Sequence, residues 1–321
     1  MSFRMNVLRK AISISKKSDS NAAEKKKKKD IKSVVVNKDY FREINDFLKK
    51  FVLRHTFHNI EEISGVKCHK LQINPSKKYF RQTKQDDKKL LLYIHGGGFC
   101  RGFALHGIYY MKAMMKRLGC EAICVDYSLS PENIYPTALN ELVAVYKELI
   151  KTHSPESIIL TGESAGANLA LALLMYLRDH KIPMPYCGVL VSGYYNLNND
   201  TSSYIINKDS DICLSKEILD LMAMTYIKGD YCSIPNELCN QKYVSPAFSS
   251  FKGLPPIMFT VCSDELLYED TAMVYSKSKQ VNPKSSLYVD KNCFHAYIVM
   301  GDTTPESKKA CNEIEKFIKS L

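Results

Sequence analysis

The sequence predicts an α/β fold, with a mostly parallel central sheet and helices on both of its faces. Two observations carry this prediction. Short runs typical of buried strands alternate along the chain with helical patterns, which favours a parallel sheet covered on both sides. Two glycine-containing motifs also follow directly after two of these strands. The chain has 321 residues, enough for one large α/β domain with an additional segment over it.

Six short apolar runs have the length and composition of buried strands. They are expected at residues 90–94, 122–125, 157–160, 188–191, 257–261 and 286–289. Helical patterns at 137–150, 165–179 and 306–321 alternate with them, and the pattern at 165–179 is apolar nearly all round, as in a buried central helix. A further amphipathic pattern at 38–58 predicts a helix ahead of the first strand.

One long stretch interrupts the alternation of strands and helices. Residues 196–251 contain no strand pattern, although they separate two predicted strands. Ligands of open α/β sheets bind outside the carboxyl ends of the strands, which is where this stretch begins. We therefore predict a helical cap formed by residues 38–60 and 196–251.

Basic residues are concentrated at the N-terminus. The net charge is +11, and Lys25 to Lys29 form an uninterrupted run. Because such a run repels itself, residues 1–37 are expected to be a disordered, lysine-rich tail, followed by one domain at 38–321. No nucleic-acid motif accompanies the run, so no nucleic-acid partner is expected. Peripheral contact with an anionic membrane and organelle targeting are left open.

The cysteines indicate the compartment. Eleven of them are scattered along the chain without a C-x-x-C pair. In a sequence without a secretory signal they are expected to be reduced thiols of a cytoplasmic protein. No histidine or cysteine spacing fits a metal site, so neither a metal nor a cofactor is expected. The sequence leaves the oligomeric state open.

A strand-to-helix turn carries the first chemical motif. Gly162-Glu163-Ser164-Ala165-Gly166 is a G-x-S-x-G sequence that follows the predicted strand at 157–160 and opens the helix at 165–179. In this context the turn exposes the serine hydroxyl, and the helix N-terminus favours an anion. The motif predicts Ser164 as a nucleophile.

A glycine run follows the predicted strand at 90–94. His95-Gly96-Gly97-Gly98-Phe99 offers backbone N–H groups that can point at one oxygen atom. The tetrahedral anion of acyl transfer needs such donors. Because both motifs follow parallel strands, they are expected on the same edge of the sheet.

A serine nucleophile needs a base, and the base needs an orienting acid. His295 follows the last predicted strand and is the expected base. Asp264 stands in the loop after the strand at 257–261 and is the expected acid, while Glu265, Glu269 and Asp270 are competing candidates nearby. The order serine, acid, histidine is the one expected of an α/β-hydrolase.

Together these residues resemble the hormone-sensitive-lipase-like family of α/β-hydrolases, which includes carboxylesterases and arylacetamide deacetylases. The resemblance covers about residues 88–300 and includes HGGGF at 95–99, GESAG at 162–166 and DYSLSPE at 126–132. It implies an oxyanion hole from the amides of Gly97, Gly98 and Ala165, and a small ester as substrate. Glu163 and Ser128 depart from the family pattern, in which Asp or Thr and Arg are usual.

The resemblance leaves alternatives open. The same groups would serve an amide hydrolase or deacetylase, because both reactions pass through a tetrahedral anion. A catalytically inactive relative that binds small molecules is the third reading, since a fold does not fix a function. The lysine-rich tail lies outside the resemblance, so deleting residues 1–34 is expected to leave turnover of a dissolved ester largely unchanged.

Overall fold

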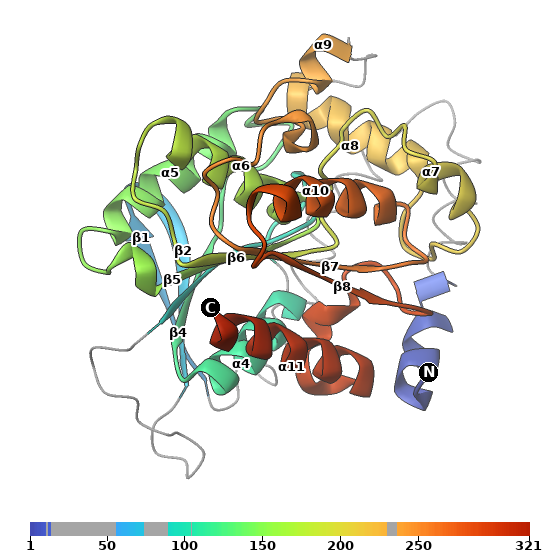
Figure 1. The fold of residues 1–321 in the computed structure, drawn as a ribbon, viewed down its shortest axis with the longest axis horizontal. Coiled ribbons are helices and arrows are strands. Elements are labelled where there is room, and N and C mark those ends of the chain that lie inside the picture. The colour runs from blue at the N-terminus through green and yellow to red at the C-terminus, as the bar shows by residue number, and fades with distance from the viewer. Residues whose placement is uncertain (11, 14–55, 74–88, 104, 230–235) are drawn as a thin grey trace.

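The computed structural model describes the whole chain except residues 11, 14–55, 74–88, 104 and 230–235. Its centre is an eight-stranded sheet in the order β1-β2-β4-β3-β5-β6-β7-β8 (Figure 1). Strands β3 through β8 all run parallel to one another, whereas β1 and β2 are added at one edge through antiparallel pairs, β2 with β4 and β1 with β2. The predicted α/β fold is confirmed.

All six predicted strands are present. They are β3 (Leu90–Ile94), β4 (Glu121–Val125), β5 (Ile158–Glu163), β6 (Cys187–Val191), β7 (Ile257–Cys262) and β8 (Ser286–Asp290). The three predicted helices next to them are α5 (Thr137–Leu149), α6 (Ala165–Asp179) and α11 (Pro305–Ser320). Two helices that the sequence reading did not identify complete the layers, α4 (Leu105–Leu118) and α10 (Tyr268–Val281).

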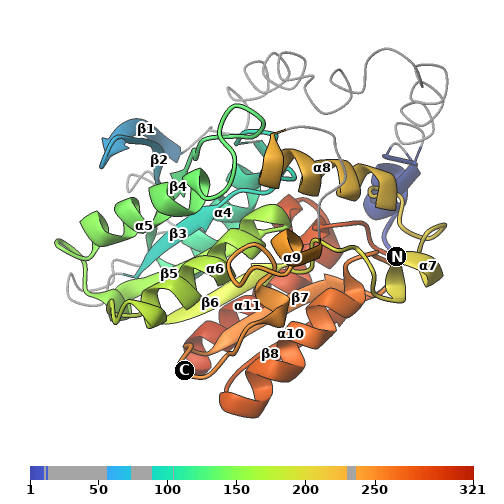
Figure 2. The same ribbon diagram turned by 90° about the horizontal axis from the view of Figure 1, so that it is seen from above.

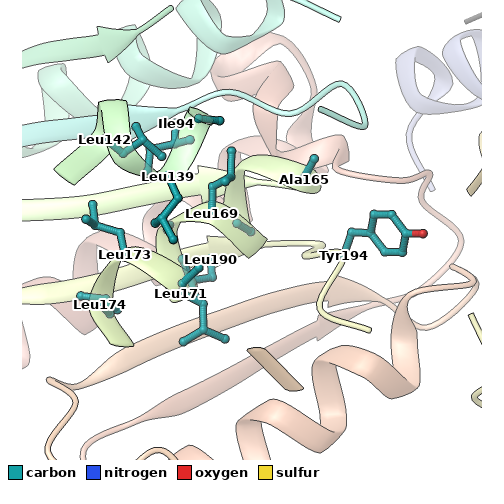
Figure 3. Packing of buried hydrophobic residues seen from close by; sticks show 14 of the residues in the cluster. Ile94, Leu139, Leu142, Ala165, Leu169, Leu171, Leu173, Leu174, Leu190 and Tyr194 are labelled. Carbon is teal, nitrogen blue, oxygen red and sulfur yellow. The ribbon is translucent and has the colours of Figure 1, made fainter. Parts of the chain in front are cut away.

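The helices form one layer on each face of the sheet. Helices α5, α6 and α10 cover one face, and α4 and α11 cover the other together with the 3-10 segment η4 (Tyr297–Thr303) (Figures 1 and 2). Helix α6 is the centre of the first core: twelve of its residues are buried, and Leu169, Leu171 and Leu173 pack there with residues of the sheet and of α5 (Figure 3). Each core buries one face of the sheet.

A hairpin at the sheet edge was missed. Strands β1 (Thr56–Ile63) and β2 (Val66–Ile73) are joined through Ser64 and Gly65, both at positive φ. Such a two-residue turn is a hairpin signal, but β1 is polar and largely exposed, so no strand was expected. The helix predicted at 38–58 is therefore wrong for residues 56–58, and its remainder lies outside the described residues. The segment expected to join the cap, 38–60, is a strand at residues 56–60.

The stretch between β6 and β7 contains helices joined by turns and loops where it is described. It contains α7 (Ser203–Ile206), α8 (Lys216–Lys228), α9 (Asn236–Cys239) and the 3-10 turn η3 (Pro246–Phe248). Helix α8 begins at the cap Ser215 and ends at Gly229, whose φ of 72° suits glycine. The prediction that residues 196–251 carry no strand holds for the described part of that stretch.

The prediction of a disordered tail from residue 1 is wrong for the first residues. Residues 3–10 form a helix, here called the N-terminal helix, and the side chain of Met5 is fully buried. The helix lies beyond the ends of β7 and β8 in both views (Figures 1 and 2). The lysine run lies outside the described residues. No helix in the described parts of the chain has both the length and the hydropathy to cross a membrane.

One close approach requires glycine at the start of α6. A Cβ atom on Gly166 would lie 2.2 Å from the carbonyl oxygen of Ile94 and 2.4 Å from that of His95. We expect Gly166→Ala to lower the free energy of unfolding by about 1–3 kcal/mol or more, because neither carbonyl can move without disturbing β3. Urea unfolding followed by circular dichroism measures the change.

The matched control is Gly188→Ala in β6. Its added Cβ would meet side-chain atoms of Ile257 at 3.4 Å, an ordinary contact distance. This variant should unfold close to wild type. Equal effects of the two substitutions would contradict the packing argument.

Candidate active site

The site lies at the carboxyl ends of the parallel strands. Ser164 follows β5 directly and adopts φ 52° and ψ −121°, a strained conformation for a residue with a side chain. It immediately precedes α6, so its hydroxyl stands at the amino end of that buried helix. The sharp turn predicted from the G-x-S-x-G motif is present.

The glycine run packs directly against this turn. A Cβ on Gly96 would lie 2.9 Å from the carbonyl oxygen of Glu163 and 3.1 Å from Cβ of Ser164. Gly97 and Gly98 have φ of 110° and 61°, which favour glycine. The structure therefore brings the HGGGF segment and Ser164 together. Ala165, the third residue implied in the oxyanion hole, is the first residue of α6, where the amides have no partner within the helix.

Glu163 links the two motifs. Its carboxylate Oε1 accepts a hydrogen bond from the amide of Gly96 at 3.2 Å, and the residue is buried. The glutamate that departs from the family pattern thus joins the nucleophile turn to the glycine run. Sequence reasoning noted the departure but did not predict this bond, because the bond depends on how closely the two loops approach.

The DYSLSPE segment supports the glycine run from the other side. The Tyr127 hydroxyl donates to the carbonyl oxygen of His95 at 2.9 Å, and the two rings stack with centroids 4.2 Å apart. The amide of Ser130 donates to the carbonyl of Phe99 at 3.0 Å. Ser128, the second departure, donates through its amide and its hydroxyl to Glu141 of α5. This motif therefore fixes the shape of the HGGGF loop.

The partner of His295 is Glu265. The Nδ1 atom of His295 lies 2.7 Å from Oε2 of Glu265, whose side chain is only 1% exposed. The prediction that Asp264 orients His295 is wrong, and the alternative Glu265 takes that place. The other two candidates are bonded elsewhere: Asp270 accepts from Thr201 and Tyr204, and Glu269 accepts from Ser202 and the amide of Ser203.

Asp264 faces a different set of groups. Its Oδ2 accepts from the amide of Asn292 at 3.0 Å and lies 3.9 Å from the guanidinium of Arg9. Its Oδ1 accepts from the hydroxyl of Ser263 at 3.1 Å. The two acids are neighbours in one tight turn after β7, so successive side chains point to different sides, and a sequence pattern cannot tell which side faces the histidine.

Ser192 is a residue of the candidate site that sequence reasoning missed. It follows β6 directly, and its hydroxyl donates to Oε1 of Glu265 at 2.8 Å while accepting from the amide of Ala296 at 3.2 Å. The amide of Cys262 donates to the same Oε1 atom at 2.9 Å. A serine directly after a buried strand, between the nucleophile strand and the acid strand, was the available signal.

The end of β6, at Val191 and Ser192, also connects the turn at Ser164 with the loop that carries His295. Val191 accepts the amide hydrogen of Ser164 at 2.8 Å. The end of β6 therefore touches the nucleophile turn through one residue and the histidine loop through the next. This arrangement places Ser164, His295 and Glu265 around one point of the sheet edge.

The segment after β6 forms hydrogen bonds with the loop that carries Glu265, here called the acid loop. Asn207 donates through Nδ2 to the carbonyl oxygens of Ser263 and Glu265, at 2.9 and 2.7 Å. Asp211 accepts the amide hydrogen of Leu266 at 2.9 Å. These contacts fix the backbone on both sides of Glu265. No cluster of three or more metal-binding side chains occurs within the described residues.

Comparisons with known proteins identify the family. A family model described as alpha/beta hydrolase fold matches residues 91–299. An esterase of Acinetobacter venetianus is 32% identical over 234 residues, covering 73% of this chain and 75% of the relative. An acetyl-hydrolase of Streptomyces hygroscopicus is 28% identical over 243 residues, covering 75% and 79%.

Solved structures show the same architecture. A double mutant of a crystallised esterase superposes with a TM-score of 0.73 at 26% identity, covering 83% of this chain and 84% of that one. An esterase from the bacterial hormone-sensitive lipase family superposes with a TM-score of 0.74 at 24% identity, covering 87% and 91%; at this identity the likeness shows the fold alone. The chain belongs to the α/β-hydrolase-fold family, as its motifs predicted.

The pairing of His295 with Glu265 has a measurable consequence. Burial lowers the pKa of His295, but the charge of Glu265 and the hydrogen bond to it raise the pKa by more, so that it lies above the ordinary histidine value. The imidazolium form is therefore favoured in the folded protein. Its stabilising contribution is complete below about pH 6.5, the unfolded value, and is lost as the pH rises through the higher folded pKa.

We expect a proton NMR titration to place the pKa of His295 above about 6.5 in the wild-type chain. In Glu265→Gln the charge is removed but the shape is kept, so the pKa should fall below the wild-type value. Glu269→Gln is the control, because Glu269 is bonded to Ser202 and Ser203, and it should leave the pKa close to wild type. An equal or larger fall in the Glu269 variant would contradict the observed pairing.

Proposed function

We propose that the chain is a serine carboxylester hydrolase in which Ser164 is the nucleophile, His295 the general base and Glu265 the orienting acid. The observation that carries the proposal is the buried Glu265–His295 pair beside the strained turn at Ser164. The esterase and acetyl-hydrolase relatives support an ester as the substrate.

The reaction follows from the roles of these groups. Neutral His295 takes the proton of Ser164 while the oxygen attacks the ester carbonyl, and the Glu265 carboxylate stabilises the imidazolium that forms. The amides of Gly97, Gly98 and Ala165 are proposed to bind the tetrahedral oxyanion. His295 then protonates the leaving alcohol. Water next attacks the acyl-enzyme and gives a proton to His295, which returns it to the Ser164 oxygen as the C–O bond to the acyl group breaks and the carboxylic acid is released.

The groups that shape the acyl site favour a short acyl chain. A Cβ on Gly98 would lie 2.1 Å from Sδ of Met222, so the side chain of Met222 in α8 rests directly on the glycine run. The ring of Tyr226, one turn further along α8, stacks on Phe99 with centroids 3.8 Å apart. We propose that α8 caps the site and that Met222 limits the space beside the reacting carbonyl.

We also propose that the enzyme works in a reducing, cytoplasmic compartment. The cysteines within the described residues are free thiols, most of them buried, which supports the prediction of a reducing, cytoplasmic compartment. Peripheral contact of the lysine-rich segment with anionic membranes remains a prediction about residues outside the described ranges.

The triad assignment is tested by turnover of a soluble p-nitrophenyl ester. Ser164→Ala should abolish activity and keep the fold. Glu265→Gln should lower kcat by orders of magnitude, because a neutral amide can hold the wrong tautomer of His295; a related acid-to-amide change in another serine hydrolase costs about ten-thousandfold. Wild-type turnover in either variant would refute the assignment, and fluorophosphonate labelling of Ser164 provides an independent measurement.

The acyl preference is tested by shortening Met222. Met222→Ala should raise kcat/KM for a hexanoate ester relative to an acetate ester by about tenfold or more, since a methylene in an apolar pocket is worth about 1–3 kcal/mol. Met224→Ala is the matched control, because a residue two positions on points to the other side of α8. An unchanged ratio in the Met222 variant would show that another group limits the chain length.

A further inference from the structure

The N-terminal helix is attached to the two loops that carry the acid and the histidine. Met5 is fully buried and belongs to the same core as Cys293, Phe294 and Ala296. The Ser2 hydroxyl donates to Oε2 of Glu306 at 2.7 Å. The guanidinium of Arg4 donates to the carbonyl oxygen of Thr303 at 3.1 Å, which fixes the helix at a second place.

Arg9 stands where these two loops meet. Its guanidinium donates to the carbonyl oxygen of Cys293, two residues before His295, and lies 3.9 Å from the carboxylate of Asp264, directly before Glu265. Both side chains of this ion pair are mostly shielded from solvent, with 21% and 17% exposure for Arg9 and Asp264. One guanidinium therefore contacts the acid loop and the histidine loop together.

Asp264 also links the acid loop to the loop that carries His295. Its carboxylate accepts the amide hydrogen of Asn292, three residues before His295. The acid loop and the histidine loop are also joined by the amide of Cys293 bonding to Sγ of Cys262 at 3.3 Å. Because all these contacts lie within three residues of His295 or Glu265, they set the separation of the two loops.

We propose that Arg9 and Asp264 are positioning residues that hold the acid loop and the histidine loop at the separation required by the hydrogen bond between Glu265 and His295. The inference rests on the proposed function, because this separation matters for turnover only if His295 acts as the base. It also gives a role to the residue first predicted as the catalytic acid, and it reverses the expectation that the first 34 residues do not affect turnover.

The pair of Arg9 and Asp264 affects the geometry of the two loops more than the stability of the fold. An ion pair at 3.9 Å with partial exposure contributes little to stability. A displacement of about 1 Å in a catalytic group, by contrast, can cost about a hundredfold in rate. The pair therefore acts by restricting where the two loops lie, and its loss should appear in kcat rather than in KM.

The test uses full-length variants on one soluble ester, with active enzyme counted by fluorophosphonate labelling. Arg9→Met should lower kcat per labelled site by about ten- to a hundredfold and leave KM within about twofold. Arg9→Lys keeps the charge and one donor and should recover most of the loss. Lys10→Met, the same change at the exposed neighbouring residue, should behave as wild type.

A double-mutant cycle tests whether Arg9 and Asp264 act together. Asp264→Ala should lower kcat by a similar factor, and the double variant should be little worse than either single variant. Additive losses, wild-type kcat in Arg9→Met, or no recovery in Arg9→Lys would each overturn the proposal.

The titration of His295 provides a readout that does not depend on turnover. Charged groups face His295 from three elements: Glu265 after β7, Asp211 from the segment after β6, and Glu163 at the end of β5. If Arg9 only neutralised Asp264, Arg9→Met would raise the pKa of His295 further. If Arg9 holds the loops, the bond to Glu265 loosens and the pKa falls.

A fall in the pKa supports the proposal, and a rise overturns it. Should the wild-type chain turn over no ester at all, the proposed function fails. The titration alone then decides whether Arg9 positions the two loops.

Discussion

A buried carboxylate at Glu265 is the constraint on which the site depends. Removing a charge from water costs several kcal/mol unless donors surround it, and losing one of those donors leaves the charge unpaired. Its three donors come from separate strand ends: the amide of Cys262 on β7, the hydroxyl of Ser192 after β6 and the ring of His295 after β8. The need to satisfy this one group brings three loops together, and the parallel sheet places all three at the same edge. Ser164 is held beside them because the last residue of β6 accepts its amide hydrogen.

The buried carboxylate of Glu163 likewise joins two loops, here the turn at Ser164 and the glycine run. Its Oε1 atom accepts the amide hydrogen of Gly96. The close approach of Gly166 to the carbonyl oxygens of Ile94 and His95 is a second contact between the same two segments. The glycine run is thus fixed by Glu163, by Tyr127 and by the side chain of Met222 above it. Rigid support of this kind is what a preorganised oxyanion site requires, since its amides must not reorganise during the reaction.

The strands and the central helices could be predicted because their signals are local. A buried parallel strand is a short apolar run, and the helix α6 has the bounds that its apolar pattern indicated. The sharp turn at Ser164 and the place of His295 at the same edge of the sheet could be predicted because each residue follows such a strand. The sequence could not distinguish Asp264 from Glu265 as the partner of His295, because the choice depends on which of two adjacent side chains points towards the histidine. The N-terminal helix was missed for a related reason: Met5 and Arg9 sit in a strongly basic segment, and only the distant loops they contact make that segment ordered.

The contacts of the N-terminal helix also bear on the order of folding. Ser2 and Glu306, which hydrogen-bond to each other, are 304 positions apart in the chain, and Arg9 and Cys293 are 284 apart. Contacts between such distant residues form late, because the intervening loop must close before they stabilise anything. During synthesis residues 3–10 emerge long before the loops that they contact. The sheet and its helical layers can therefore assemble before this helix docks. By the positioning role proposed for Arg9, the loops bearing His295 and Glu265 then reach their final spacing late in folding.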